Sequence, residues 1–350
     1  MPPGQVLDLG TRFRTVKSQV ATNIVGVAGA DTFSGSTRSF ELPRTFLYKQ
    51  LFLELTGTLT GTGALQSDEM PLEYIKKIEI IADGRKLIVS APGRSLWHLA
   101  ARDFGVHPGL IAPAITPTNA PVLAVIPISF EAARMQMSAD SYFDPRPYEK
   151  IECRVTFGSL VTDLYATTGI YGTTPLSLNA VLEQTTKGIE SARFNRLLIA
   201  DDIPVTTTTT NLVQRIPRAG LLAGIQLTAL GAATPLFGKG IDDTTINFVT
   251  VRSDNNFIHV DRVKWSQLLQ MTTLQQLPFP REAPDQTAFA ATTAAAVMQG
   301  TAYIDLTEDG LLSTAINTVD LNTLDLVLDV ASGAATDHIQ ALYVFYEPVA

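Results

Sequence analysis

The chain repeats itself at about half its length, and this feature constrains its fold more than any other. Five sequence blocks recur in the same order, each displaced by 168 to 176 positions in a chain of 350 residues. The first block pairs Leu42-Pro43-Arg44 with Ile216-Pro217-Arg218, 174 positions later. The third pairs the only two tryptophans, Trp97 and Trp265, at a displacement of 168. Repetition at a fixed spacing indicates a duplicated structural unit, so we predict two copies of one domain.

Strand patterns dominate the repeated unit. Apolar residues alternate with polar ones along Lys49–Thr60 and along Ile151–Phe157. A period of two is typical of a half-buried β-strand. Tyr74–Val89 is predicted to be a hairpin with Asp83-Gly84 at its turn, and Asp83 recurs as Asp254.

Helical periodicity is confined to Arg94–Phe104 and Arg262–Leu274, one stretch in each copy. Many short strands with few helices favour a sandwich or a barrel, and the length of each copy suits a jelly roll of eight strands. We therefore predict an all-β fold of two tandem eight-stranded jelly rolls, each with one short helix. The predicted divisions are an N-terminal arm at 1–35, jelly roll 1 at 36–165, a connector at 166–189 and jelly roll 2 at 190–350.

Composition and charge argue against several classes of function. Charged residues make up 17% of the chain, against about 25% in an average protein, which suggests that other subunits cover much of the surface. A net charge of −8 argues against wrapping nucleic acid, and no sequence-specific nucleic-acid partner is expected. Residues 1–20 lack the apolar core of a signal peptide, and five prolines interrupt the uncharged stretch 104–130. We therefore expect neither a leader nor a membrane span.

The sequence contains no recognised catalytic motif, and we predict no catalytic residue, no cofactor and no enzymatic activity. The single cysteine, Cys153, lies on the apolar side of a predicted strand, as an inert core thiol would. Four acidic pairs fall in predicted turns, where aspartate bonds to nearby backbone: Asp68-Glu69, Asp201-Asp202, Asp242-Asp243 and Glu308-Asp309. A structural Ca²⁺ site remains open, because calcium takes loop carboxylates. Its candidate ligands are Asp242-Asp243, or Asp140 with Asp144 and Glu149.

Several stretches resemble a known family. Phe40–Arg44, Leu51–Thr60, Ile75–Arg85 and Gly93–Leu96 resemble the first jelly roll of the major capsid proteins of tailless icosahedral double-stranded DNA phages. These proteins form the double jelly-roll lineage, with corticovirus-, tectivirus- and autolykivirus-like members. The resemblance continues through Phe157-Gly158-Ser159 and, by way of the repeat, to the C-terminus.

The resemblance implies a structural role in a virion. It implies homotrimers of pseudo-hexameric outline that tile an icosahedral capsid shell and are assembled in the host cytoplasm. The implied partners are the chain itself, penton and minor capsid proteins, and an internal lipid membrane. Arg12, Arg14 and Lys17, with no acid between them, would face inward and contact anionic lipid or a neighbouring subunit. Two alternatives stay open, a jelly-roll glycan-binding protein and a glycan-releasing hydrolase, the second of which needs two carboxylates facing each other across a cleft.

Overall fold

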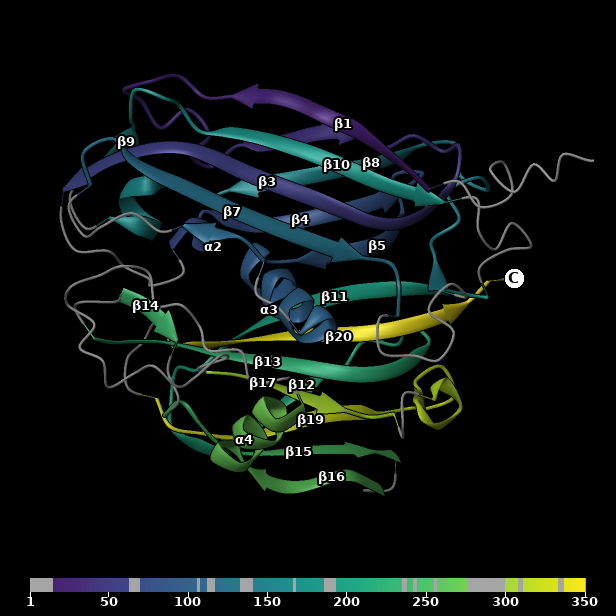
Figure 1. The fold of residues 1–350 in the computed structure, drawn as a ribbon. Helices are drawn as coiled ribbons and strands as arrows, with labels where there is room; N and C mark the ends of the chain where they lie inside the picture. The colour runs from purple at the N-terminus through teal and green to yellow at the C-terminus, as the bar shows by residue number, and fades with distance from the viewer. Residues whose placement is uncertain are drawn as a thin grey trace, which may run out of the picture.

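The chain forms two β-sandwiches that lie one above the other in Figure 1, with their strands running across the view in both. The structure is a computed structural model of the protein. It describes residues 15–62, 70–105, 108–111, 117–132, 141–165, 168–185, 193–234, 238–241, 244–254, 257–275, 300–307, 311–332 and 337–349. The N-terminal half forms the upper sandwich and the C-terminal half the lower one. Each sandwich has eight principal strands in jelly-roll order, as predicted.

The first jelly roll packs the strand order β1-β10-β3-β7 against the order β5-β4-β8-β2. The strands are β1 (Thr15–Val25), β2 (Thr37–Glu41), β3 (Leu47–Thr62), β4 (Ile75–Ala82), β5 (Lys86–Ala91), β7 (Ala120–Ser129), β8 (Ile151–Phe157) and β10 (Ser177–Thr185). Two short strands, β6 (Leu110–Ile111) and β9 (Thr168–Tyr171), extend the first sheet. A single turn, α2 (Met70–Glu73), the longer α3 (Gly93–Phe104) and the π-helical turn η2 (Leu160–Leu164) complete it, so the described part of this half contains helical elements besides the predicted one.

The second jelly roll repeats this plan, with the order β11-β20-β13-β17 packed on the order β12-β19-β15-β16. The strands are β11 (Phe194–Pro204), β12 (Thr209–Arg215), β13 (Leu221–Thr234), β15 (Ile246–Ser253), β16 (Phe257–Lys264), β17 (Thr301–Asp305), β19 (Leu324–Val330) and β20 (His338–Pro348). The minor strands are β14 (Gly238–Ile241) and β18 (Ile316–Asn317). Its helix, α4 (Trp265–Gln275), follows β16 as α3 follows β5.

Polar contacts confirm the duplication independently of the hydrophobic pattern. Asp83 accepts hydrogen bonds from the backbone N–H groups of Glu149 and Lys150, at 2.7 and 2.9 Å, just before β8. Asp254, its counterpart in the second roll, accepts from the backbone N–H groups of Asn322 and Thr323, at 2.7 and 2.5 Å, just before β19. Each carboxylate therefore fixes the entry of the chain into the same strand of its own roll.

A second equivalent pair acts at the same place. Arg44 donates to the carbonyl oxygen of Tyr148 at 2.5 Å, and Arg218 donates to the carbonyl oxygen of Asn322. The two arginines belong to the Pro-Arg block that opens the repeat. The block thus recurs because each arginine holds the segment that leads into β8 or β19.

Two of the alignments that the repeat predicts between the halves, Cys153 with Leu328 and Arg94 with Arg262, are wrong in register. Ile80 pairs with Cys153, and its equivalent Val251 pairs with Leu326, so Cys153 corresponds to Leu326 and not to Leu328. A slip of two residues leaves every side chain on the same face of a strand, and the alternating pattern cannot reveal it.

The second error concerns the helices. Arg94 lies in α3, whereas Arg262, its predicted counterpart, lies in β16. Trp97 and Trp265 occupy equivalent helices, as predicted, and both are buried. Trp265 nevertheless begins α4, whereas Trp97 lies one turn inside α3.

The predicted domain boundaries are too narrow for the first roll. β1 falls within the predicted arm 1–35, and β10 falls within the predicted connector 166–189. The two strands pair with each other, and β10 also pairs with β3. Outward-facing residues of β1 are exposed and most of its inward ones are only partly buried, because β1 lies at a sheet edge, and its strand pattern is correspondingly weak.

A continuous sheet joins the two rolls. The edge strand β5 of the first roll runs parallel to β11 of the second, with Val89 beside Leu198 and Ser90 beside Ile199. This contact merges two four-stranded sheets into one that crosses both rolls. None of the helices in the described ranges is long and apolar enough to cross a membrane.

Candidate functional site

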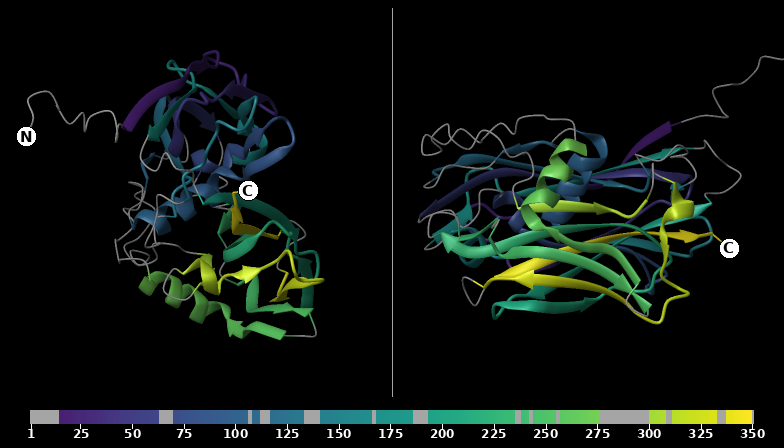
Figure 2. Two further views of the ribbon diagram at one scale, coloured as in Figure 1. Left: turned by 90° about the vertical axis from the view of Figure 1, so that its right-hand side faces the viewer. Right: turned by 90° about the horizontal axis from the view of Figure 1, so that it is seen from below.

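Helix α3 lies between the two jelly rolls (Figures 1 and 2). Gly93 opens it, at a point where an added Cβ would approach the Ile75 side chain to 3.0 Å, so the helix begins in close contact with β4. Gly105 ends it in the left-handed conformation, with φ of 69°. Leu96 and Leu99 are buried in the core of the first roll. The predicted apolar face also included Phe104, which is 38% exposed.

The polar side chains of α3 contact the second roll. The Ser95 carbonyl accepts from Gln226 Nε2 at 2.9 Å, and its hydroxyl donates to Gln340 Oε1 at 3.1 Å. His98 Nδ1 lies 2.8 Å from the Thr301 hydroxyl. All these contacts join residues of β13, β17 or β20 to the helix, so α3 presents a polar surface to the neighbouring sheet.

Buried charges strengthen the same joint. Arg102 lies with its guanidinium carbon 3.3 Å from the Tyr303 ring centroid, and its Nη2 is 3.2 Å from Asp305 Oδ2. Arg196 of β11 reaches back to Asp103, with 2.7 Å between Nη2 and Oδ2 and both side chains at most 4% exposed. Burial disfavours the charged form of Arg196, but the Asp103 carboxylate outweighs this effect and raises the pKa of Arg196 above its ordinary value.

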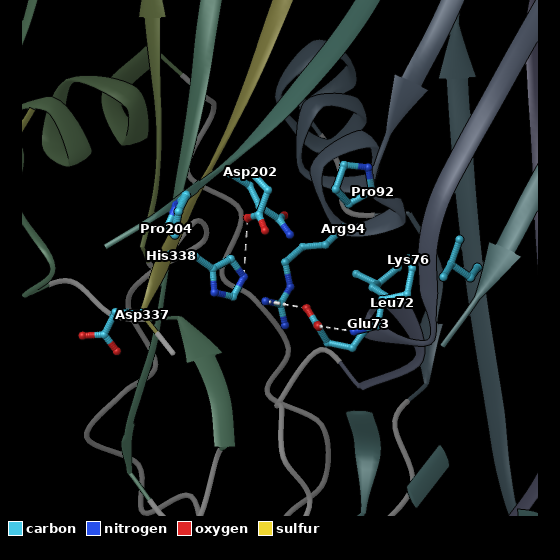
Figure 3. Close-up of a pocket in the computed structure, with 11 residues that line it drawn as sticks. Leu72, Glu73, Lys76, Pro92, Arg94, Asp202, Pro204, Asp337 and His338 are labelled. Atoms are coloured by element: carbon cyan, nitrogen blue, oxygen red, sulfur yellow. Dashed lines mark ion pairs between the residues drawn. The ribbon is translucent and has the colours of Figure 1, made fainter. Parts of the chain in front are cut away.

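A cavity of about 480 Å³ opens beside the start of α3, with walls from both rolls (Figure 3). Its charged residues are Glu73, Lys76 and Arg94 from the first roll, and Asp202, Asp337 and His338 from the second. The fully buried Arg94 contacts Glu73, with 2.6 Å between Nη1 and Oε1.

Each basic side chain that lines this cavity lies close to a carboxylate. Lys76 Nζ lies 2.9 Å from Asp163 Oδ1 and 3.8 Å from Glu73 Oε2. His338 Nε2 lies 3.8 Å from Asp202 Oδ1. Each of these basic side chains therefore already has an acidic neighbour, and the cavity presents groups of both signs to a ligand.

The structure places the acidic residues singled out from the sequence in different surroundings. Asp201-Asp202 lies in β11 and not in the predicted turn, and Gln214 Nε2 donates to Asp201 at 3.2 Å. Arg146 holds Asp144 through two contacts of 2.8 and 2.6 Å. Asp144 is partly buried, which would raise its pKa, but the Arg146 hydrogen bonds lower it further than burial raises it. Over the described ranges no three His, Cys, Asp or Glu residues come together as a metal site.

Several of the residues singled out from the sequence lie outside the described residues: Asp68-Glu69, Asp140, Asp242-Asp243 and Glu308-Asp309, together with Arg12 and Arg14.

Two further predicted residues have clear positions. Lys17 is exposed in β1, opposite Glu183 of β10. Cys153 is fully buried in β8, and burial raises the pKa of its thiol, which confirms the prediction of an inert core thiol.

Sequence reasoning missed the residues that join the rolls: Ser95, His98, Arg102, Asp103 and Arg196. A signal was present, because α3 carries three basic side chains at a spacing of four, Arg94, His98 and Arg102. That spacing places them on one helix face. From the sequence alone, a basic helix face is expected to be in contact with solvent. Their burial under a second domain becomes visible only in the structure.

No family model and no curated protein match the sequence, but solved structures match the fold over nearly the whole chain. The MCP of STIV, the Sulfolobus Turreted Icosahedral Virus, aligns with a TM-score of 0.68 and 12% identity, covering 95% of this chain and 96% of that one. The major capsid protein P2 of Bacteriophage PM2 aligns at 0.59 and 12% identity, covering 96% and 98%. The capsid of the virus PBCV-1 aligns at 0.59 and 11%, covering 95% and 93%. The chain therefore has the fold of the double jelly-roll major capsid proteins.

Proposed function

We propose that this protein is the major structural subunit of an icosahedral virus shell and that it assembles as a homotrimer of pseudo-hexameric outline. One observation carries the proposal: two equivalent jelly rolls are fused side by side through a shared sheet and a buried ionic contact. A rigid pair of like domains supplies two corners of a hexagon, so three copies in a closed ring supply six near-equivalent edges. The similarity in fold to viral capsid proteins supports the same role.

The proposal extends to location and partners. The subunit would reside in the virion shell after assembly in the host cytoplasm, beside penton and minor capsid proteins. The solved structures come from viruses of different kinds, so the assignment to a bacteriophage is a narrower part of the proposal. No enzymatic step is included, because the charges lining the cavity between the rolls are paired with one another.

Contact with an internal membrane is a further part of this proposal. Lys17 lies opposite Glu183 in the strand register, so it has an acidic residue as its neighbour. Arg12 and Arg14 precede β1 in the sequence and would carry most of the attraction to anionic lipid. Replacing all three by glutamine should weaken binding to vesicles that contain anionic lipid, and unchanged binding would remove the membrane from the proposal.

The mass of the purified full-length chain tests the central claim. Light scattering after size exclusion should give about three times 37.8 kDa, and electron microscopy should show particles of hexagonal outline. A monomer at every concentration tested, or a closed dimer, would contradict the proposal. A monomer that binds glycans or cleaves them would instead favour the glycan-binding or hydrolase alternative.

A further inference from the structure

The joint inside the chain has two components that occur together. The edge strand β5 pairs in parallel with β11, and α3, which follows β5, packs its polar side on the outer face of the sheet that contains β11, β20, β13 and β17. A strand edge and the helix after it therefore act as one docking unit, and the receiving unit is a strand edge with the sheet face beside it.

Each component of this joint has a counterpart elsewhere in the molecule. By strand order, β16 corresponds to β5, α4 to α3, and β1 to β11. In the described part of the chain β16 pairs only with β15, and β1 only with β10. The two strands lie at opposite ends of the molecule, β1 at the top and β16 at the bottom of Figure 1. The chain thus carries a second docking unit and a second receiving unit, both at its outer edges.

The second docking unit exposes apolar and uncharged side chains beside the charged Asp261, Arg262 and Lys264 of β16. Phe257 and Ile258 of β16 are 64% and 49% exposed, and Met271 of α4 is 51% exposed. Ser266, Gln267 and Gln270 are also exposed on the helix. On α3 the corresponding outward side is buried against the second roll, with His98 and Arg102 at most 5% exposed.

The second receiving unit shows the same contrast. Phe52 of β3 corresponds by strand register to Gln226 of β13, and Val181 of β10 corresponds to Leu342 of β20. Gln226 and Leu342, which lie beneath α3, are at most 1% exposed. Phe52 and Val181 alternate with core residues, point to the outer face and are only partly buried. The outer face of the first sheet therefore leaves these two apolar side chains partly exposed, among charged ones such as Glu54 and Lys17, whereas its equivalent is covered.

We propose that β16 and α4 of one copy dock on β1 and on the outer face of the first sheet of a second copy, reproducing the internal joint between molecules. The inference rests on the proposed trimer and specifies which surfaces form it. Because the docking and receiving units are different surfaces, the contact is head to tail. A head-to-tail contact closes into a ring when its rotation divides the circle, and a ring of three copies would alternate internal and intermolecular joints.

The internal register predicts the intermolecular one. The pair Lys17 and Glu183 of β1 and β10 corresponds to the pair Leu198 and Val344 of β11 and β20. Ser18, the residue after Lys17, is therefore equivalent to Ile199, the residue after Leu198. Ile80 opposite Val89 corresponds to Val251 opposite Val260, and Ile78 opposite Ala91 corresponds to Val249 opposite Val263. β16 therefore has one residue more than β5 in this stretch, and we assign the extra residue to Arg262, whose φ is 40°, so Asp261 takes the place of Ser90. Since Ser90 pairs with Ile199 inside the chain, Asp261 of one copy should lie beside Ser18 of the next.

Disulfide trapping tests this register in the full-length chain. Directly paired residues of neighbouring strands lie within the Cα separation that a disulfide spans, and the native Cys153 is fully buried, so it should not compete. The double variant Ser18→Cys with Asp261→Cys should give, under mild oxidation, linked dimers and trimers on a non-reducing gel. Each single variant should stay unlinked, and an equal mixture of the two should give dimers only.

The matched control is Gln19→Cys with Asp261→Cys, because Gln19 is the next residue of β1 and points to the opposite face. Should the first pair impair folding, Lys17→Cys with Val260→Cys tests the adjacent position of the same register. A trimer by mass in which neither pair links would overturn the inference and leave the proposed function intact. Linkage in a single variant would show a contact between identical surfaces and would also overturn the inference. A monomer in all variants and in the unaltered chain would overturn the proposed trimer itself.

Discussion

Removal of the Asp103 carboxylate should destabilise the protein far more than loss of an ordinary surface charge. Asp103 and Arg196 join the two rolls with 2.7 Å between their charged atoms, and both side chains are at most 4% exposed. Asp103 Oδ1 also accepts from Arg102 Nη1 at 3.2 Å. The substitution Asp103→Asn keeps the shape of the side chain and leaves two buried guanidinium groups without their shared carboxylate.

The expected cost follows from this burial. Breaking a buried ion pair by removing one partner costs about 3–5 kcal/mol. Arg196 keeps hydrogen bonds to the carbonyl oxygens of Ser129 and Glu131, at 3.2 and 3.0 Å, which favours the lower end of that range. With a urea slope of about 3 kcal/mol per M, the unfolding midpoint should fall by about 1 M.

Equilibrium urea unfolding at a fixed protein concentration measures this shift. The matched control is Glu79→Gln, which removes a carboxylate that lies 2.7 Å from Lys77 Nζ, where the lysine side chain is 48% exposed. An exposed pair of this kind contributes about 0–1 kcal/mol. The double variant Asp103→Leu with Arg196→Met should recover much of the loss, because the Arg196 guanidinium is then removed together with its carboxylate, while Arg102 keeps its contact with Asp305. Equal midpoints for Asp103→Asn and Glu79→Gln would refute the reasoning.

Three other experiments have defined outcomes. Asp83→Ala and Asp254→Ala should each lower the melting temperature by similar amounts, because the two carboxylates hold equivalent strand entries. The backbone hydrogen bond from Asn322 lowers the pKa of Asp254, so the stability that Asp254 contributes should be present above the ordinary carboxyl pKa and disappear as the pH falls through the lowered value. Thermal scans of Asp254→Asn should lack this pH dependence. Cys153 should not react with a thiol reagent in the native protein and should react in urea, because it is fully buried; rapid native labelling would contradict its placement. Gly224→Ala should lower the melting temperature, because the added Cβ would lie 2.0 Å from Tyr303 Oη and would push that ring away from Arg102; a melting temperature equal to that of the unaltered chain would contradict it.

Several strands in the middle of the sheets could be predicted from the sequence, because burial on one face makes apolar residues alternate. β10 is an exception, since it alternates in the same way but falls within the predicted connector. β8 and β19 have the bounds that their patterns predict, and both bury every second residue. The edge strand β1 was missed, because an edge carries fewer buried side chains. β12 was missed for a similar reason, since none of its residues is fully buried.

The residues that join the rolls could not be assigned to that role from the sequence. Arg102 and Asp103 are adjacent in the chain, and a helix that carries them is typical of a partly solvated surface. Their partners Asp305 and Arg196 lie 203 positions after Arg102 and 93 positions after Asp103, and no periodicity links sites so far apart. Only the stacking of the two rolls brings them together.

The difference in charge between α3 and α4 gives the duplicated chain a property that a single-domain ancestor would lack. Six separate jelly rolls in a ring would share six identical joints, all equally hard to break. With two rolls on one chain, the internal joint is tethered and carries the buried arginines of α3 and β11, whereas the helix at the outer joint presents serine, glutamine and methionine. In the proposed assembly the internal joint would therefore be permanent while the outer one stays reversible, which would let a growing shell release misplaced copies and anneal before it closes.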